Sequence, residues 1–489
     1  MTISQALYNA SSGLTAASKR VSVTSNNIAN ALTPGYARRT VHLAEQTTGG
    51  EGAGVSVAGI SRATNPALTY ERRIVDGELA YFSANAGAMT RVSDLLGGVE
   101  DPTSLFQKYN NFEASLRNLA ETPDSAALQQ KVVSTAQELT RALNKTAEGY
   151  QQIRADADME ISNRVKSVND ALQTIEDLND SISRGLATGK DVNALLDQRQ
   201  QLVDLVNENI PVKEIQREYG KVDLMTTEGV FLLAGSAKTI EFTPSPVVTA
   251  DLTYNNGAGT LSGLTIDGND ITPGGPSGQS PRDGAVAGLF NVRDVTVPEM
   301  ALALDALAYD IASRLSDPAV DPTLNPGDPG IFTDAGANAD VANLNGLAGR
   351  ISVNALVDSS QGGSPSRIRD GIGSVVPQAA GTDAFVRSLL SALADNRPQH
   401  AALQTAGDLT AAESFSHMTS LAAGARVDAS SKEATSATLA TSLSEAEQLE
   451  SGVDTDRELQ DLLVIEQAYA ANARVLETID QMMRRLMEI

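Results

Sequence analysis

Apolar residues at both ends of the chain recur at alternating spacings of three and four residues, which is the pattern of a coiled-coil seam. A mean spacing of about 3.5 residues keeps one stripe of a helix facing a partner along its length, so the pattern predicts two long terminal helices. The N-terminal series is Ile3, Leu7, Ala10, Leu14, Ala17, Val21 and Ile28. The C-terminal series is Leu462, Ile465, Tyr469, Asn472, Leu476, Ile479, Met483 and Leu486.

Both terminal stripes are narrow, and an isolated helix of this kind is marginal in water. We therefore expect the two helices to pair, and we expect the large residues of the N-terminal series and the whole C-terminal series to form an assembly interface. Asn472 is the polar member of its series. It either sets the register, as a single buried Asn does in coiled coils, or faces a polar neighbour.

Between the terminal helices the pattern of hydrophobic and polar residues changes twice, from helical to strand-like and back. Residues 65–209 are mainly helical in pattern, and Pro211 begins a stretch rich in Val, Thr, Gly and Pro. This stretch has strand-like runs such as 222–225 and 239–242, with turn signals at Asn255-Asn256-Gly257 and after Asp267. We expect a further strand at residues 351–357, and a helical pattern returns from Asp383 to the end. The order predicts a β-rich region inserted in a helical body.

The predicted fold class is therefore a multidomain α+β protein in which the two termini share one domain. A chain of 489 residues is too long for one core, and we expect about three domains. They are a terminal coiled-coil domain of residues 1–45 and 450–489, a helical bundle of 46–210, 284–317 and 380–449, and a β-rich outer domain of 211–283 and 318–379.

Composition limits the partners and the chemistry. The net charge of −24, from 37 basic and 61 acidic residues, opposes binding to nucleic acid and to anionic membranes. The chain has no cysteine, which excludes disulfides, thiolate nucleophiles and sulfur-ligated zinc. No stretch is long and apolar enough to insert in a membrane, and the N-terminus lacks the pattern of a cleavable signal peptide.

The sequence gives little indication of catalytic or ligand-binding residues. His42, His400 and His417 share no metal-binding spacing, so ordinary core or solvated histidines are the better interpretation. The glycines of residues 50–54 are not followed by the Lys and Ser or Thr of a phosphate loop, and we interpret them as a hinge before a short strand. The segment after Asp267 lacks the spacing of a calcium loop. We expect no catalytic residue, no metal and no cofactor.

A further motif follows the N-terminal series. It consists of Asn26, Asn27, Asn30, Thr33, Pro34, Gly35, Tyr36 and Arg38. The asparagines can cap or turn the backbone, and the Pro-Gly pair ends the helix, so the motif would aim the helix relative to the next segment. An ordinary capped helix end is the simpler alternative.

This motif resembles the signature of the bacterial flagellar axial proteins, and its Pro-Gly-Tyr form resembles that of the first hook-associated proteins, which sit at the hook-filament junction. Three further stretches match in the same order: residues 52–57 with Ile60 and Arg62, residues 451–454, and residues 467–475. The match is strong at the two ends, moderate through the helical body and nearly absent in the β-rich region. The chain departs from the family at Arg39, where the family often has glutamine, and at Ala31, which in the family often lies in a polar stretch.

The resemblance implies a structural subunit that acts as an adaptor between hook and filament. Its expected partners are other copies of itself in a ring or tube, the hook protein and the next hook-associated junction protein. It implies export through the flagellar type III pathway without a cleavable signal, helped by a cytosolic chaperone at the C-terminal region, to an extracellular position. The alternatives are another axial subunit of rod, hook or filament, or a flagellar cell-wall hydrolase, which would need convergent carboxylates or a nucleophile.

Overall fold

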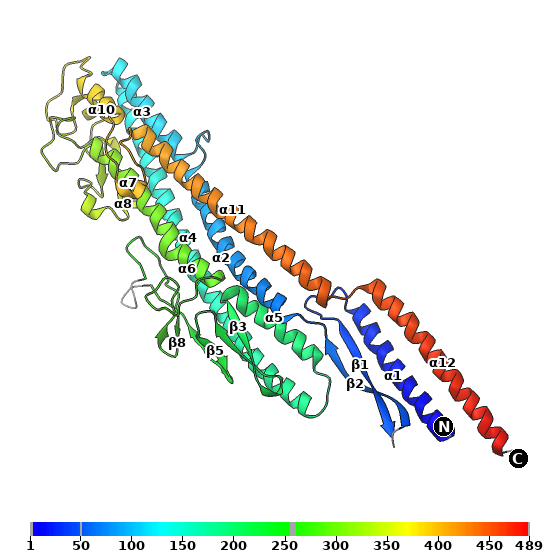
Figure 1. Ribbon diagram of the computed structural model, residues 1–489. Helices are drawn as coiled ribbons and strands as arrows, with labels where there is room; N and C mark the ends of the chain where they lie inside the picture. Colours follow the sequence, from blue (N-terminus) through cyan, green and yellow to red (C-terminus); the bar gives the residue numbers. More distant parts are fainter. Residues whose placement is uncertain (1–2, 49–50, 255–260, 488–489) are drawn as a thin grey trace. The chain divides into compact units, whose positions relative to one another are not determined.

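The computed structural model describes residues 3–48, 51–254 and 261–487 (Figure 1). The chain forms two compact units. The terminal unit comprises Met1–Gly77, Ser167–Thr239 and Ser436–Ile489, and the central unit comprises Glu78–Lys166 and Ile240–Thr435. Three long helices contribute to both units: α2 (Pro66–Leu96), α4 (Ala126–Ala187) and α11 (Ala411–Ser451).

The terminal unit holds both ends of the chain. In Figure 1, α1 and α12 run side by side, and a two-stranded hairpin lies along α1. A four-stranded antiparallel sheet in the order β3-β4-β5-β6 follows α5. The elements are α1 (Ile3–Ala29), β1 (Arg39–Thr48), β2 (Glu51–Arg62), α5 (Asn193–Asn209), β3 (Val212–Gln216), η1 (Glu218–Gly220), β4 (Val222–Thr226), β5 (Phe231–Ala234), β6 (Ser236–Ala237) and α12 (Thr455–Met487).

The central unit is built on a large apolar core. Tyr109 stacks on Phe415 with ring centroids 4.6 Å apart, and Phe112 meets Phe332 edge-on at 5.4 Å. Its elements are α3 (Leu105–Glu121), β7 (Ile240–Glu241), β8 (Thr265–Ile266), β9 (Asn269–Asp270), α6 (Ala285–Asn291), the π-helix η2 (Val292–Thr296), α7 (Val297–Arg314), β10 (Phe332–Asp334), η3 (Val341–Asn343), α8 (Leu347–Arg350), β11 (Ile351–Val353), η4 (Ser359–Gln361), α9 (Arg367–Asp370), α10 (Ala384–Ala394) and η5 (Ala401–Leu403).

Buried charges fasten the loops beside β7 and β8 to the helices of the central unit. Arg293 is fully buried, lies 2.5 Å from Asp158 and donates to the carbonyl of Ser262 at 3.0 Å. Arg154 donates to the carbonyls of Thr249 and Leu252. Because removing one partner leaves a charge unpaired in the interior, this part of the β-rich region is tied to the helical core.

The long terminal helices and the multidomain α+β class are confirmed. The segment predicted as one β-rich domain is divided between the two units at residues 239 and 240. Residues 318–379 contain little strand, because the apolar side chains around β10 and β11 pack into the helical core of the central unit. The three predicted domains stay a prediction, and the turn predicted at Asn255-Asn256-Gly257 lies outside the described residues.

The interpretation of residues 50–54 as a hinge is wrong for its described members. Gly52 pairs with Thr47 inside the hairpin, and Gly54 lies within β2. A Cβ on Gly54 would lie 2.2 Å from the Ser12 hydroxyl oxygen of α1, and its φ is +92°. Glycine is needed there because the strand approaches the helix closely.

Candidate assembly interface of the terminal helices

Packing of α1 on α12 buries small residues on the first helix and two isoleucines on the second. Ala10 and Ala17 of α1 are buried, as are Ile465 and Ile479 of α12. A Cβ on Gly13 would lie 2.9 Å from the side-chain amide of Asn472. Small residues on one face of α1 therefore let the helices approach closely.

The predicted seam residues fall into three groups in the terminal unit. Ile465 and Ile479 are buried, at 1% and 5% exposed. Partly buried residues form the second group: Leu14, Val21, Ile28, Leu462, Asn472 and Leu476. The exposed group is Ile3 at 38%, Leu7 at 40%, Tyr469 at 45%, Met483 at 43% and Leu486 at 60%. The pairing of α1 with α12 thus covers part of the predicted interface and leaves the rest open.

Asn472 does not reach across to a polar group of α1. Its side-chain amide donates to the carbonyl of Ala468 in its own helix at 3.0 Å, and it rests against Gly13. The contact with a glycine limits which residue of α1 can lie opposite.

Sequence reasoning missed a second apolar stripe on α12. The residues at its positions share alternating spacings of four and three and are all exposed: Val464, Ala468, Ala471, Val475, Thr478 and Met482. Val464 is 58% exposed, Val475 46% and Met482 49%. The same spacing rule that identified the first stripe could have found this one. We call these six residues the outer stripe of α12.

The geometry of the motif at the end of α1 centres on Asn27, which is 1% exposed. Its side-chain amide donates to the carbonyl of Arg39 at 2.9 Å and to the carboxylate of Glu458 in α12 at 3.1 Å. Its side-chain oxygen accepts from the Tyr36 hydroxyl at 2.9 Å and from the Arg39 amide at 3.0 Å. One side chain therefore joins α1, the start of β1 and α12.

The rest of the motif closes the end of α1. Asn30 donates from its side chain to the carbonyl of Asn26 at 2.9 Å, and the Thr33 hydroxyl donates to Asn30 at 3.3 Å. Pro34 accepts a hydrogen bond from the side-chain amide of Gln201 in α5 at 2.6 Å. Gly35 has a φ of +74°, a region that favours glycine, and a Cβ there would meet the Gln201 side chain.

Charged residues extend this joint to α5 and α12. Arg38 lies 3.9 Å from Glu458, and its backbone amide donates to the carbonyl of Ser451 at 2.8 Å. Arg39, where the sequence departs from the family pattern, lies 3.1 Å from Asp197 and 4.9 Å from the centre of the Tyr36 ring. Burial raises the pKa of the Tyr36 hydroxyl, an effect that nearby Arg39 opposes. The neutral hydroxyl is the form that donates to Asn27.

An open groove lies beside this joint within the terminal unit. It has a volume of about 970 Å³ and is lined by residues 31–37, by parts of α2 and α5, by the end of α11, and by the segment that joins α11 to α12. Leu32 and Leu449 line it and are 98% and 88% exposed. Large exposed apolar side chains that gather in one place mark interaction surfaces. Their sequence positions carry no periodic signal that would have identified them.

The three histidines make local hydrogen bonds. The His42 ring lies 2.6 Å from the Ser61 hydroxyl across the hairpin. A ring nitrogen of His400 accepts from the Ala402 amide at 3.2 Å, and the His417 ring lies 2.7 Å from the Leu403 carbonyl. In the described part of the chain, no group of three His, Asp or Glu residues is arranged to hold a metal ion. Within that part, no helix is both long and apolar enough to cross a bilayer.

Comparison with family models gives three matches along the chain. Residues 89–318 match the helical domain of the flagellar hook-associated protein FlgK. Residues 7–36 match the flagellar basal body rod protein model, and residues 449–489 match the C-terminal model of the basal body rod proteins FlgEFG. The two terminal matches cover most of α1 and all of α12.

Among curated proteins, the chain is similar to the flagellar hook-associated proteins 1 of two bacteria. It is 24% identical to that of Bacillus subtilis over 387 residues, which cover 72% of this chain and 74% of the relative. It is 29% identical to that of Salmonella typhimurium over 251 residues, which cover 50% of this chain and 45% of the relative. A solved structure, the flagellar hook junction protein FlgK from Burkholderia pseudomallei, gives a TM-score of 0.44 at 20% identity, covering 54% of this chain and 46% of that one.

Terminal helices that match axial rod proteins, around a body that matches a hook-associated helical domain, define a structural subunit of the bacterial flagellum. The helical-domain match and the curated relatives agree in pointing to the flagellar hook-associated proteins 1, to which this chain is similar. The resemblance noted from the motif is thereby confirmed.

Proposed function

We propose that this flagellar subunit is the adaptor at the hook-filament junction and that it assembles there through the exposed faces of its terminal helices. The outer stripe of α12 carries the proposal. It has the spacing of a coiled-coil seam, and no element of its own chain covers it among the described residues. Such a stripe gains stability when another helix packs on it.

In this proposal one face of α12 packs on α1 within the subunit, and the outer stripe packs on other subunits. Ile465 and Ile479 face α1 within one subunit, while Val464, Val475 and Met482 stay exposed. We infer that copies of the chain close into a ring or tube by packing these exposed faces. The hook protein and the next hook-associated protein would contact the two ends of that ring. Export by the flagellar type III pathway, with a chaperone at the C-terminal region, is part of the same proposal, as is an extracellular position.

The groove at Leu32 and Leu449 is a second part of the proposed interface. It lies next to the joint at which Asn27 and Glu458 fix α12 against α1. A neighbouring subunit that packs on α12 would meet this groove at the start of that helix. We propose no catalytic role for the chain, and the histidines, which were the candidate chemical residues, are engaged in local hydrogen bonds.

Position on the flagellum tests the proposed function. A fluorescent tag on the chain should label one spot per flagellum, between hook and filament. In cells that make hooks without filaments, the label should remain at the hook tip. Labelling along the whole filament, or only at the cell body, would contradict the junction role and favour another axial subunit.

A further inference from the structure

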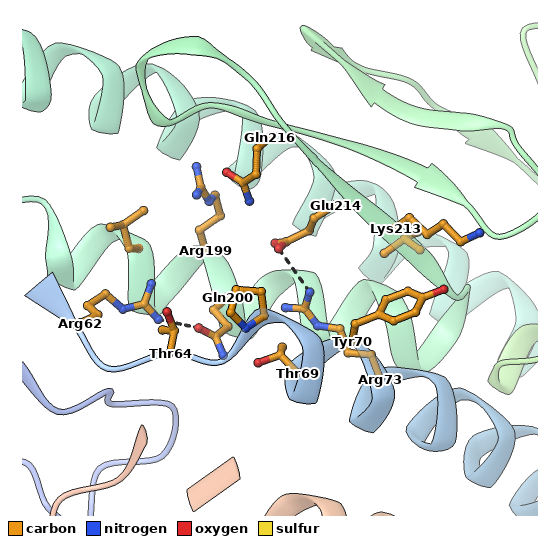
Figure 2. Close-up of a pocket in the computed structure, with 13 residues that line it drawn as sticks. Arg62, Thr64, Thr69, Tyr70, Arg73, Arg199, Gln200, Lys213, Glu214 and Gln216 are labelled. Atoms are coloured by element: carbon orange, nitrogen blue, oxygen red, sulfur yellow. Dashed lines mark hydrogen bonds and ion pairs between the residues drawn. The ribbon is translucent and has the colours of Figure 1, made fainter. Parts of the chain in front are cut away.

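A basic pocket lies in the terminal unit, away from the terminal helices. It has a volume of about 470 Å³ and is lined by the start of α2, by α5 and by β3 (Figure 2). Its lining includes four cations, Arg62, Arg73, Arg199 and Lys213, and one carboxylate, Glu214. Four cations around one cavity are unusual in a chain with a net charge of −24.

Two of the arginines are neutralised by carboxylates. Arg62 lies 2.7 Å from Asp197, and Arg73 lies 2.6 Å from Asp204 and 3.4 Å from Glu214. Figure 2 shows Arg62 joined to Gln200 and Arg73 joined to Glu214. These ion pairs hold the walls of the pocket in place.

Arg199 differs from these two arginines. It is 7% exposed, and its guanidinium donates to two neutral oxygens, the side-chain oxygen of Asn179 at 3.0 Å and the carbonyl of Gly220 at 2.6 Å. Within the described residues it makes no ion pair with a carboxylate. Burial lowers the pKa of Arg199, an effect that the negative charge of Glu214 opposes. A buried cation without an ion pair is costly, so an anion that enters the pocket would be stabilised there.

Lys213 adds a second cation without an ion pair in the described part of the chain. It lies on β3 beside Glu214 and is partly exposed. The remaining walls include apolar side chains, from Pro66, Tyr70, Leu196 and Val212. Such a lining suits a carboxylate attached to a larger, partly apolar body better than a small inorganic anion.

We propose that this pocket receives an acidic side chain of a second copy of the chain. The chain carries 61 acidic residues against 37 basic ones, so a neighbouring copy presents many carboxylates to a basic pocket. The choice of a second copy as the occupant rests on the proposed function, since self-assembly brings copies together around the terminal unit. The contact would lock the subunits at a point separate from the outer stripe of α12.

Zero-length carbodiimide cross-linking tests the pocket directly, because it joins a lysine amine to a carboxylate that touches it. Equal amounts of normal and ¹⁵N-labelled full-length chain are mixed at low ionic strength, cross-linked and digested. We expect mass spectrometry to find mixed-isotope pairs that join Lys213 to an Asp or Glu of the other copy. Lys190, an exposed lysine of the same unit, serves as the control.

Further experiments test whether the contact depends on charge and whether the carboxylate comes from a second copy. About 1 M salt should reduce the mixed-isotope Lys213 pairs about tenfold, because it screens charges. Arg199→Gln should also reduce the mixed-isotope Lys213 pairs about tenfold, provided that the variant melts like the unchanged protein. If the variant melts at a lower temperature, the effect of salt on the unchanged protein tests the role of charge instead. Free glutarate should compete with the second copy in the same pocket.

Two outcomes would overturn the proposal. One is that the Lys213 pairs come only from a single copy or are no more frequent than those of Lys190. The other is that glutarate binds while mixed-isotope pairs never form, which would make a small free carboxylate the ligand. Because the cross-link is read on the purified chain, its failure would leave the localisation test of the proposed function unaffected.

Discussion

Val475→Asp is expected to abolish incorporation of the subunit into flagella while the purified protein melts normally. Val475 lies in the middle of the outer stripe of α12 and is 46% exposed, so the carboxylate stays in water in the free subunit. In the proposed assembly the same position is buried against another helix, where an unpaired charge costs several kcal/mol. A loss of about 3 kcal/mol corresponds to more than 100-fold weaker association.

The matched control is Gln481→Asp. Gln481 lies on α12 outside the outer stripe and is exposed, so the change also introduces one negative charge on the same helix. Motility and electron microscopy of hooks read the effect: hooks without filaments and subunit in the medium for Val475→Asp, normal filaments for the control. Loss of incorporation in both variants would mean that charge on α12, and not the stripe, is responsible.

Asn27→Ala is expected to loosen the joint between α1, β1 and α12. Four hydrogen bonds end on the Asn27 side chain, and the substitution removes all of them. It leaves Glu458, which is 3% exposed, without one of its donors. Buried polar groups that lose their partners cost about 1 to 3 kcal/mol each, so we expect a loss of about 2 to 4 kcal/mol in the local free energy of opening.

Amide hydrogen exchange on the purified chain measures this loss, with the first turns of α12 as the reporter region. Asn26→Ala is the control, since Asn26 is exposed and contributes its backbone carbonyl to the bond with Asn30. Exchange in α12 should rise strongly in Asn27→Ala and stay unchanged in the control. Equal exchange in the two variants would show that the Asn27 hydrogen bonds do not hold α12.

The terminal helices could be predicted from the sequence because the spacing of their apolar residues is local information. The same rule identified Ile465 and Ile479 as members of a seam, and the structure buries both against the rest of the terminal unit. The outer stripe of α12 was overlooked because one stripe already satisfied the coiled-coil pattern. Val464, Val475 and Met482 obey the rule equally well, so a search for every stripe on the helix would have found them.

Long-range contacts could not be predicted in the same way. Asn27 and Glu458 are separated by 431 positions, and neither residue has a neighbour in sequence that indicates the other. Local reasoning assigned the asparagines to capping, which describes Asn30 but not the buried role of Asn27. The glycines of β2 were misinterpreted for a related reason, since the need for Gly54 comes from Ser12, a residue of another element.

The basic pocket shows a further limit of sequence reasoning. Arg62, Arg73, Arg199 and Lys213 lie on four different elements or their ends, with no motif that joins them. The fold alone brings them around one cavity. Family resemblance did not indicate it either, because Arg62 is the one pocket cation that belongs to the motifs on which the resemblance rests.

Protection of a thiol on the outer stripe tests the central claim most directly. The chain has no cysteine, so Val464→Cys introduces a single thiol at a position that is 58% exposed in the free subunit. Val376→Cys, at a position 68% exposed in the central unit, gives a matched reference. The rate of reaction with a maleimide is then compared between the free subunit and isolated flagella. We expect the thiol from Val464→Cys to react at least about tenfold more slowly after assembly, while the reference thiol keeps most of its reactivity. Equal reactivity of the Val464→Cys thiol in free and assembled protein would contradict assembly through the outer stripe of α12.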